Sequence, residues 1–461
     1  MRTESGHEQV QDHEPPRAAA GPTSRRRLHR LAQRMAVPLG RREPGRLARI
    51  APFWRNVATV FGGAVGAQAL PLLAAPLLTR LCSPGELGAY SVWLGIVAIA
   101  AIGATLRMEA AMILDHEPER QRACFRVVFY SSTATALGLT LLAAGARLAG
   151  VEAASRLSWT GLLTLGIGTW LTACMQTTLA YATSHNAFGK AARAKVATAA
   201  VIVVSQLALL QAGMGGLGLV LGHLAGTATG LATARRLLRP PAAPIGWRLD
   251  HEQREHLVRH QKFWRYSLPS NLLNGAVSQL PLFLIGVRHG ALAAGLYALT
   301  QRVLAAPVSL VAASVLEVFK RESVHEFEEH GNCSRAYRHT FKALALLGAG
   351  PALGLLLFAP QLFAWVFGER WRAAGELAQL MAPLFLLNFI ASPLSYVFFV
   401  AGRQKADLWW QVTLFAVTLA AFLAPGSVAH NVLCYALGYS CLYLVYLRMS
   451  WQCSRNARGA T

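Results

Sequence analysis

The sequence predicts an all-α polytopic membrane protein with about twelve membrane-crossing helices in two six-helix lobes. Of its 461 residues, 54% are apolar and only 14% are charged, a composition unlike that of ordinary soluble domains. Apolar runs of about 20 residues recur along the chain, each long enough to cross roughly 30 Å of hydrocarbon. These runs are continuous rather than alternating, and backbone groups in lipid must bond internally, so the spans are predicted to be helices.

An internal repeat predicts the division into two lobes. Three short segments recur at offsets of 210, 210 and 207 residues: Phe53-Trp54-Arg55 as Phe263-Trp264-Arg265, Leu70-Pro71 as Leu280-Pro281, and Gly88-Ala89-Tyr90 as Gly295-Leu296-Tyr297. Each copy opens a long apolar stretch. Parallel halves of this kind are typical of transporters, in which a substrate pathway forms between the halves.

The predicted spans define five segments of the chain. Residues 1–52 are expected to form a disordered basic tail, 53–237 the first lobe, 238–262 a basic linker, 263–447 the second lobe and 448–461 a second tail. The spans are placed at Val57–Thr79, Leu87–Leu106, Val127–Ala146, Trp159–Ala182, Val196–Ala212, Leu217–Ala234, Ser267–Val287, Ala291–Val318, Ala343–Phe367, Leu377–Ala401, Leu408–Ala424 and Val428–Leu447.

The net charge of +22 is explained by membrane topology rather than by nucleic-acid binding. With the N-terminus in the cytoplasm, 37 of the 44 Lys and Arg residues fall on the tails and inward loops, six on the outward loops and one, Arg302, within a span. Positive residues accumulate on the cytoplasmic side of membrane proteins, so both termini are predicted to be cytoplasmic and no nucleic-acid partner is expected.

Several features argue against an enzyme or a metalloprotein. The predicted outward loops have roughly a dozen residues or fewer, too few for a catalytic domain. The seven cysteines are scattered, form no CxxC or other metal-ligand spacing, and are interpreted as small apolar fillers. No Walker A sequence is present, so direct use of ATP is not expected. No catalytic residue and no metal site is therefore predicted.

Four blocks of sequence resemble bacterial polysaccharide-biosynthesis flippases. They are Leu70–Tyr90, which contains Thr-Arg-Leu and Pro-Gly-Glu-Leu-Gly-Ala-Tyr, Thr105–Ala111 with Met108 in place of the usual aromatic residue, Ala294–Pro307, and Val366–Gly375. In this order, the blocks make the chain similar to the Wzx-like oligosaccharide flippases of the multidrug/oligosaccharidyl-lipid/polysaccharide (MOP) exporter superfamily. The resemblance covers about Phe53 to Ala424.

The resemblance implies two six-helix lobes around a central cavity that opens alternately to either side. It implies a protein of the bacterial cytoplasmic membrane that moves polyprenyl-pyrophosphate-linked oligosaccharide to the outer leaflet for O-antigen, capsule or exopolysaccharide synthesis. The implied partners are this lipid-linked substrate, membrane lipid and other polysaccharide-assembly membrane proteins. No cofactor is implied, other than coupling to a proton or sodium gradient.

Arg302 is the first candidate for substrate binding. It lies eleven residues after the predicted start of its span at Ala291, which is about 16 Å at 1.5 Å per residue. A charge at this depth costs on the order of 3 kcal/mol and is expected to face a wet cavity or a partner. A guanidinium binds phosphate oxygens bidentately. The alternative is a structural pair with a carboxylate or with helix carbonyls.

Further candidates lie near the span ends and on the polar faces. Glu109 and Glu317 are candidates for ion coupling, with snorkelling or pairing at the interface as the alternative. Arg107 is expected on a different helix face from Glu109, because the two are two residues apart. The remaining substrate-binding candidates are Arg107, Arg80, Gln68, Gln279 and Asn274, with membrane anchoring or interhelical hydrogen bonding as their alternatives. His223, alone in its span, is interpreted as a hydrogen-bonded packing residue.

Three other functions compete with the flippase. A multidrug exporter of the same superfamily is the nearest alternative, although it favours carboxylates and aromatic residues for cationic drugs. A membrane glycosyltransferase is disfavoured by the short outward loops. A structural scaffold does not explain the repeat.

Overall fold

The computed structural model describes residues 66–115, 117–150, 159–241, 251–307, 311–400 and 404–455. The chain divides into two compact units, Met1–Arg55 and Asn56–Thr461, and all of these residues belong to the second unit. The described residues are mainly helical and contain no strand, which confirms the predicted all-α class. The predicted tail over residues 1–52 lies outside them.

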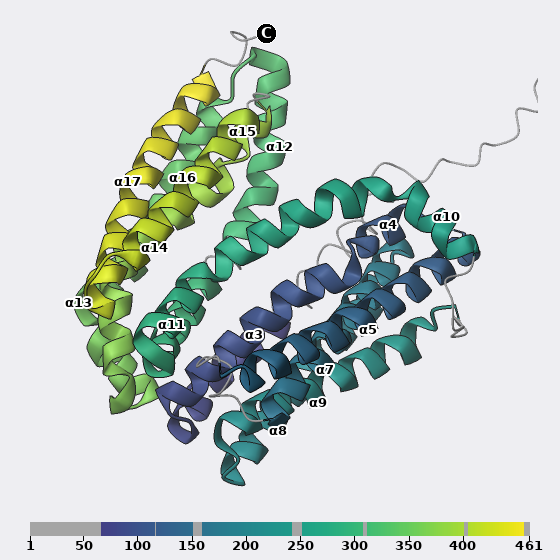
Figure 1. Ribbon diagram of the computed structural model, residues 1–461. Coiled ribbons are helices and arrows are strands. Elements are labelled where there is room, and N and C mark those ends of the chain that lie inside the picture. The colour runs from purple at the N-terminus through teal and green to yellow at the C-terminus, as the bar shows by residue number, and fades with distance from the viewer. Residues whose placement is uncertain are drawn as a thin grey trace, which may run out of the picture. The chain divides into compact units, whose positions relative to one another are not determined.

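The helices of the first half coincide with the predicted spans (Figure 1). A helix over residues 66–81 corresponds to the described part of the first span. A short helix, α4 (Met108–Leu114), lies between the second and third spans. The other helices of this half are α3 (Pro84–Thr105), α5 (Pro118–Leu148), α7 (Trp159–Ser184), α8 (Phe188–Gln211) and α9 (Gly215–Leu238).

The second half begins with the linker helix α10 (His251–Arg259) and a π-helical turn, η1 (Phe263–Ser267). The long α11 (Leu268–Pro307) contains the seventh span and the start of the eighth, separated at Gly290, whose φ of 85° and ψ of 175° interrupt the helix. The remaining elements are α12 (Ala313–His330), α13 (Ser334–Phe367), η3 (Glu369–Trp371), α14 (Arg372–Leu394), α15 (Val397–Val400), α16 (Gln404–Leu423) and α17 (Val428–Arg455).

Length and composition make the chain a multi-pass membrane protein. Among the described residues, eight helices are long and apolar enough to cross a membrane, and Trp410–Leu423 is a shorter apolar helix. With α11 counted as two spans, and with α7 and helix 66–81 added, the prediction of about twelve spans agrees with the structure. Large apolar side chains on these helices, including Leu142, Leu346 and Trp365, are at least 75% exposed, as expected for surfaces that face lipid.

The eighth span is predicted to run from Ala291 to Val318. The structure describes helix on both sides of residues 308–310, with α11 described to Pro307 and α12 from Ala313 to His330. The first turns of α12 are apolar and its later turns carry Lys320, Arg321 and several glutamates. The predicted end of the span at Val318 lies close to the boundary between these apolar and polar turns.

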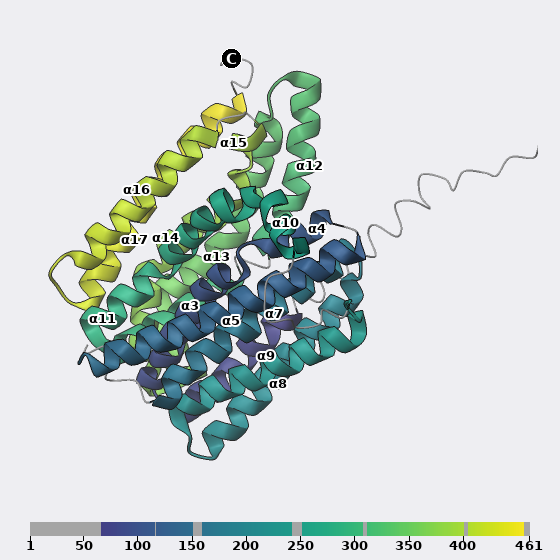
Figure 2. The ribbon, with the colours of Figure 1, turned by 45° about the vertical axis from the view of Figure 1, so that its right-hand side comes forward.

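Two repeat-related glycines bring the halves into close contact. An ideal Cβ on Gly88 of α3 would lie 1.8 Å from the carbonyl oxygen of Ala291, and one on Gly295 of α11 would lie 1.7 Å from that of Pro84. Only glycine permits this approach of backbone to backbone. We call this end of the bundle the glycine end, defined by Gly88, Gly290 and Gly295. Figures 1 and 2 both show α3 beside α11.

The local sequence positions this contact. Ser83 and Glu86 form a capping box at the start of α3, in which the Ser83 N–H donates to Glu86 Oε2 at 2.7 Å and the Glu86 N–H donates to Ser83 Oγ at 3.3 Å. Nearby, the Trp371 indole N–H donates to the carbonyl oxygen of Thr79 at 2.9 Å and joins η3 to the first half. Two kinds of contact therefore hold the halves together at the glycine end.

Small residues also determine packing within the first half. On α9, a glycine recurs every fourth residue, and each one contacts α8: Gly222 packs on Gln206, Gly226 on Ile202 and Gly230 on Thr198. This spacing places the three glycines on one face of the helix. In lipid, no hydrophobic driving force brings helices together. Association therefore depends on close packing, which small residues permit.

Candidate functional site

Arg302 lies where the second half faces the first. It is half-buried on α11, and its charge acts on the Tyr90 hydroxyl of α3 and on the His223 imidazole of α9. Side chains on a helix lean toward its N-terminus, so the guanidinium is directed toward the glycine end. Among the described residues, no carboxylate lies within ion-pair distance of Arg302.

A polar cluster on the first half lies opposite this arginine. The Tyr90 hydroxyl and His223 Nδ1 are 3.0 Å apart and hydrogen-bonded. The Trp93 ring stacks on Tyr90 with centroids 6.1 Å apart and meets His223 edge-on at 5.6 Å. Gln206 lies beside the Tyr90 hydroxyl and donates to the Leu219 carbonyl at 2.8 Å. We call Tyr90, Gln206, His223 and Arg302 the interhelical polar cluster.

Sequence reasoning found only part of this cluster. It identified Arg302 by depth and interpreted His223 as hydrogen-bonded, and the bond to Tyr90 is present. It did not assign Tyr90 or Gln206 to a site. The signal for Tyr90 was its repeat partner Tyr297, which is also buried and accepts a hydrogen bond from Gln301. An aromatic hydroxyl at the same repeat position in both halves, each within an apolar span, indicates a shared polar role.

The other predicted substrate-binding residues do not gather around Arg302 uniformly. The Gln279 side chain lies near α3, where its Oε1 would be 3.2 Å from a Cβ on Gly95. Asn274 is exposed on the first part of α11, and Gln68 is exposed on helix 66–81. Arg80 is exposed at the end of the same helix, toward the glycine end. Gln279 is thus between α3 and α11, whereas the side chains of the other three are exposed.

Arg107 and Glu109 form a direct ion pair, which corrects the expectation that they point to different helix faces. Leu106 and Arg107 have φ angles of 51° and 60°, so the helix is interrupted between α3 and α4 and regular helical spacing does not apply. The Arg107 Nη1–Glu109 Oε1 distance is 2.8 Å, and the carboxylate side chain is 14% exposed. Glu109 Oε2 is buried without a hydrogen-bond partner in the described part of the chain.

Glu317, the second predicted ion-coupling residue, is on the surface of α12. Its side chain is 72% exposed and pairs with Lys320 at 2.8 Å. The two predicted coupling carboxylates therefore have different environments, and only Glu109 is substantially buried.

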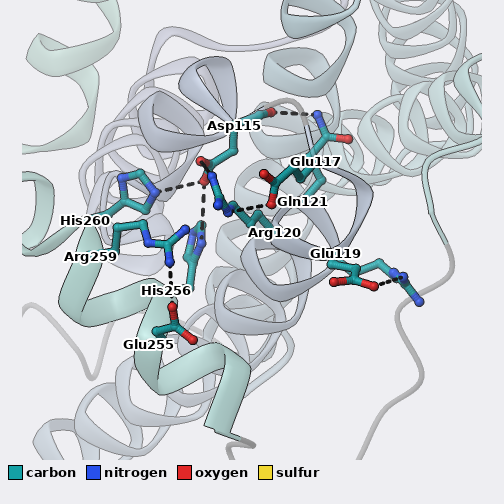
Figure 3. A network of polar contacts seen from close by, with 10 residues as sticks. Asp115, Glu117, Glu119, Arg120, Gln121, Glu255, His256, Arg259 and His260 are labelled. Atoms are coloured by element: carbon teal, nitrogen blue, oxygen red, sulfur yellow. Dashed lines mark hydrogen bonds and ion pairs between the residues drawn. The ribbon is translucent and has the colours of Figure 1, made fainter.

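A second polar cluster lies where α10 packs on α5, and sequence analysis did not identify it (Figure 3). Asp115 Oδ2 is 2.8 Å from His260 Nε2 and 3.6 Å from His256 Nδ1. Burial, together with the charge of His260, lowers the pKa of His256 to about 4, so this ring is neutral near pH 7. The available signal was the spacing of two histidines four residues apart in the linker, which places them on one face when the segment is helical.

Comparison with known proteins assigns the family. Residues 77–376 match the family described as polysaccharide biosynthesis protein. The chain belongs to this family. This match agrees with the resemblance to polysaccharide-biosynthesis flippases that the sequence shows.

Individual relatives are more distant. The chain is 26% identical over 178 residues to the teichuronic acid biosynthesis protein TuaB of Bacillus subtilis strain 168. This alignment covers 38% of the chain and only 37% of the length of TuaB. It therefore supports the family without transferring the activity of the relative.

Solved structures of MOP transporters share the fold. One is a multidrug resistance MATE family transporter in an inward-facing conformation, with a TM-score of 0.57 and 15% identity over 85% of this chain and 93% of the other. Another is a MOP superfamily transporter from Pyrococcus furiosus, with a TM-score of 0.56 and 17% identity over 86% and 93%. The fold of this chain is therefore that of solved membrane transporters.

Proposed function

We propose that this protein is a flippase that moves polyprenyl-pyrophosphate-linked oligosaccharide across the bacterial cytoplasmic membrane. The family supports a role in polysaccharide biosynthesis, and the fold supports transport. Arg302 carries the substrate assignment. A half-buried guanidinium without a carboxylate partner in the described part of the chain requires an anion or water, and a pyrophosphate accepts its planar pair of donors bidentately.

The neighbouring polar groups suit the same substrate. Tyr90 and His223 offer hydrogen-bonding groups beside the cation, and Trp93 gives the site an apolar wall. Sugar hydroxyls need donors and acceptors, whereas the polyprenyl chain remains in lipid between the halves. An anionic head group and a neutral glycan are thus accommodated by one cationic, hydrogen-bonding site.

The contacts at the glycine end support an alternating-access mechanism. The distribution of Lys and Arg supports placing both termini and α10 on the cytoplasmic side, with the glycine end outside. Arg302 is seven residues beyond Gly295 on α11, about 10 Å toward the cytoplasm. A head group entering from the cytoplasm reaches Arg302 while the Gly88–Gly295 contact closes the outer side. Release requires this contact and the Trp371–Thr79 hydrogen bond to open.

Glu109 is the residue that we propose for coupling to a proton or sodium gradient. It is largely buried, one carboxylate oxygen lacks a partner among the described residues, and Arg107 compensates its charge in this state. Protonation or sodium binding would release Arg107, and this changes the charge at the interruption between α3 and α4. Movement of α3 relative to α11 would then be linked to the ion gradient.

The test compares Arg302 variants in a strain that lacks the chromosomal gene. Arg302→Ala should abolish translocation and leave lipid-linked oligosaccharide on the inner leaflet, detected by its inaccessibility to a membrane-impermeant oxidant in intact cells. Arg302→Lys should restore part of the activity, because it retains the charge but not the planar fork. Arg321→Ala, at an exposed position on α12, controls for loss of one positive charge.

Two outcomes would refute the proposal. Full translocation by Arg302→Ala at wild-type membrane abundance would remove the role of this residue. Unchanged polymer and no trapped lipid in the deletion strain, together with drug resistance on overexpression, would favour the multidrug exporter. A positive charge at the site disfavours cationic drugs, so we expect no such resistance.

A further inference from the structure

The cluster between α10 and α5 has the composition of a transition-metal site. It consists of Asp115, His256 and His260, which all lie in the described part of the chain and are all buried. One possible ligand atom from each residue lies within 4.8 Å of the other two. Figure 3 shows both imidazoles on α10 directed toward the same carboxylate.

The backbone fixes this arrangement. The His260 N–H donates to the His256 carbonyl oxygen at 3.0 Å, so the two histidines lie on successive turns and share one helix face. Their ring centroids are 4.7 Å apart. Asp115 ends α4 at its C-cap, and its carbonyl oxygen accepts a hydrogen bond of 2.8 Å from Gln121 of α5. The α10 segment therefore supplies the two histidines, and the end of α4, bonded to α5, supplies Asp115.

The buried, unpaired side chain of His256 indicates a missing ligand. The residue is only 4% exposed, and neither ring nitrogen has a hydrogen-bond partner among the described residues. Leaving a buried polar group unpaired costs about 1–3 kcal/mol, so such groups indicate an absent partner. Neutral imidazole nitrogen and carboxylate oxygen are both ligands that zinc accepts.

We propose that Asp115, His256 and His260 bind a Zn²⁺ ion that joins the linker helix α10 to the first half of the protein. Zinc–ligand bonds of about 2.0–2.2 Å place tetrahedral ligand atoms roughly 3.3 Å apart. The distances from Asp115 Oδ2 to the two histidine nitrogens, 2.8 Å and 3.6 Å, bracket this value, and all three ligand atoms lie within 4.8 Å of one another. Zinc would draw the two imidazoles to this spacing. Water takes the fourth position.

Access and charge are compatible with a divalent cation. A cavity of about 220 Å³ lies beside the cluster and is lined by Glu117, Glu119, Arg120, Ala123, Glu255, His256 and Arg259. The two arginines have their own partners: Arg120 Nε lies 2.8 Å from Glu117, and Arg259 pairs with Glu255 at 2.5 Å. Arg120 Nη1 also lies 4.0 Å from Asp115 Oδ1, whereas both histidines face the other carboxylate oxygen, Oδ2.

The site has a structural consequence for the chain. α10 lies in the segment that connects the two halves and precedes η1 and α11, and Asp115 lies between α4 and α5. Zinc would fix the position of this segment on the first half. Because the site is independent of Arg302 and of the glycine end, its existence does not depend on the proposed flippase activity.

The experiment measures zinc binding by the full-length protein in detergent, purified without a polyhistidine tag and stripped with chelator. After dialysis against ZnCl₂, we expect one zinc per chain by mass spectrometry. Replacement of zinc by Co²⁺ should give the visible absorption of a tetrahedral site. His256→Gln, His260→Gln and Asp115→Asn should each weaken binding at least 10- to 100-fold. His251→Gln is the matched control, because it removes an exposed histidine from the same helix.

A comparison of the wild-type protein with a triple variant can overturn the proposal. If the wild type retains no more zinc than the triple variant His256→Gln/His260→Gln/Asp115→Asn, the site does not exist, whether or not the single variants fold. Equal affinity of His256→Gln and His251→Gln would also overturn it. A size-exclusion profile and helical circular dichroism equal to those of wild type show that a loss of zinc is local.

Discussion

The contact between Gly88 and Gly295 gives the sharpest prediction about conformational change. Adding a methyl group in Gly88→Ala would place Cβ 1.8 Å from the Ala291 carbonyl oxygen, whereas real Cβ contacts are essentially never shorter than 3.0 Å. The backbones must therefore separate by at least about 1.2 Å. The atom in the way is a backbone oxygen, which cannot rotate aside as a flexible side chain does.

The size of the effect follows from the cost of overpacking. Inserting a methyl group into a tight contact costs typically about 1–3 kcal/mol. If only the state with α3 and α11 in contact bears this cost, the equilibrium shifts about 5- to 150-fold toward states in which the glycine end is open. Gly295→Ala should act similarly, because its Cβ would meet the Pro84 carbonyl oxygen at 1.7 Å. The double variant should show less than the sum of both effects, since one separation relieves both clashes.

Spin-label distances measure this shift. Nitroxides on unnatural amino acids at positions 80 and 372 replace exposed arginines near the Thr79–Trp371 hydrogen bond, and their distance distribution should broaden toward longer values in Gly88→Ala. Gly85→Ala is the matched control on the first turn of α3, where an added Cβ would meet no atom within 4 Å. Identical distributions and identical transport for Gly88→Ala and Gly85→Ala would refute the close contact.

Three further predictions concern single side chains. Trp371→Phe removes the hydrogen bond to Thr79 and should lower the free energy of unfolding by about 1–2 kcal/mol, measured by thermal unfolding in detergent with Trp365→Phe, at an exposed position, as control. A double-mutant cycle of Arg107→Gln and Glu109→Gln should give a coupling energy of about 0.5–3 kcal/mol, and additivity would exclude an effective ion pair. In chelator-treated protein, stability should fall by up to about 3 kcal/mol as pH decreases from about 6.5 to about 4. His256 in the unfolded chain has a pKa of about 6.5 and binds a proton as the pH falls below this value. In the folded chain its pKa is about 4, so the proton binds only at lower pH and the unfolded state is favoured in between. His256→Gln should lose this pH dependence, and a pH profile equal to wild type would contradict the assignment.

The candidate sites show where sequence reasoning reached its limit. Depth within an apolar span identified Arg302, because a lone charge in hydrocarbon is informative without any knowledge of its neighbours. Its neighbours Tyr90, Gln206 and His223 come from three other helices, and only packing brings them together. Likewise, regular helical spacing predicted that Arg107 and Glu109 point to different faces. The positive φ angles of Leu106 and Arg107 interrupt the helix, and the two side chains form an ion pair.

The sequence by itself determined the membrane class, the number of spans and their approximate bounds. These properties depend on hydrophobic length and on the requirement that backbone groups bond internally in lipid, and both are local. The repeat also selected Gly88 and Gly295 as equivalent positions. Only the tertiary structure decided that these glycines touch each other, that α11 reverses at Gly290, and that Asp115 meets two histidines more than 140 residues later. Such contacts depend on how helices distant in sequence pack, and hydrophobic periodicity carries no information about which faces meet.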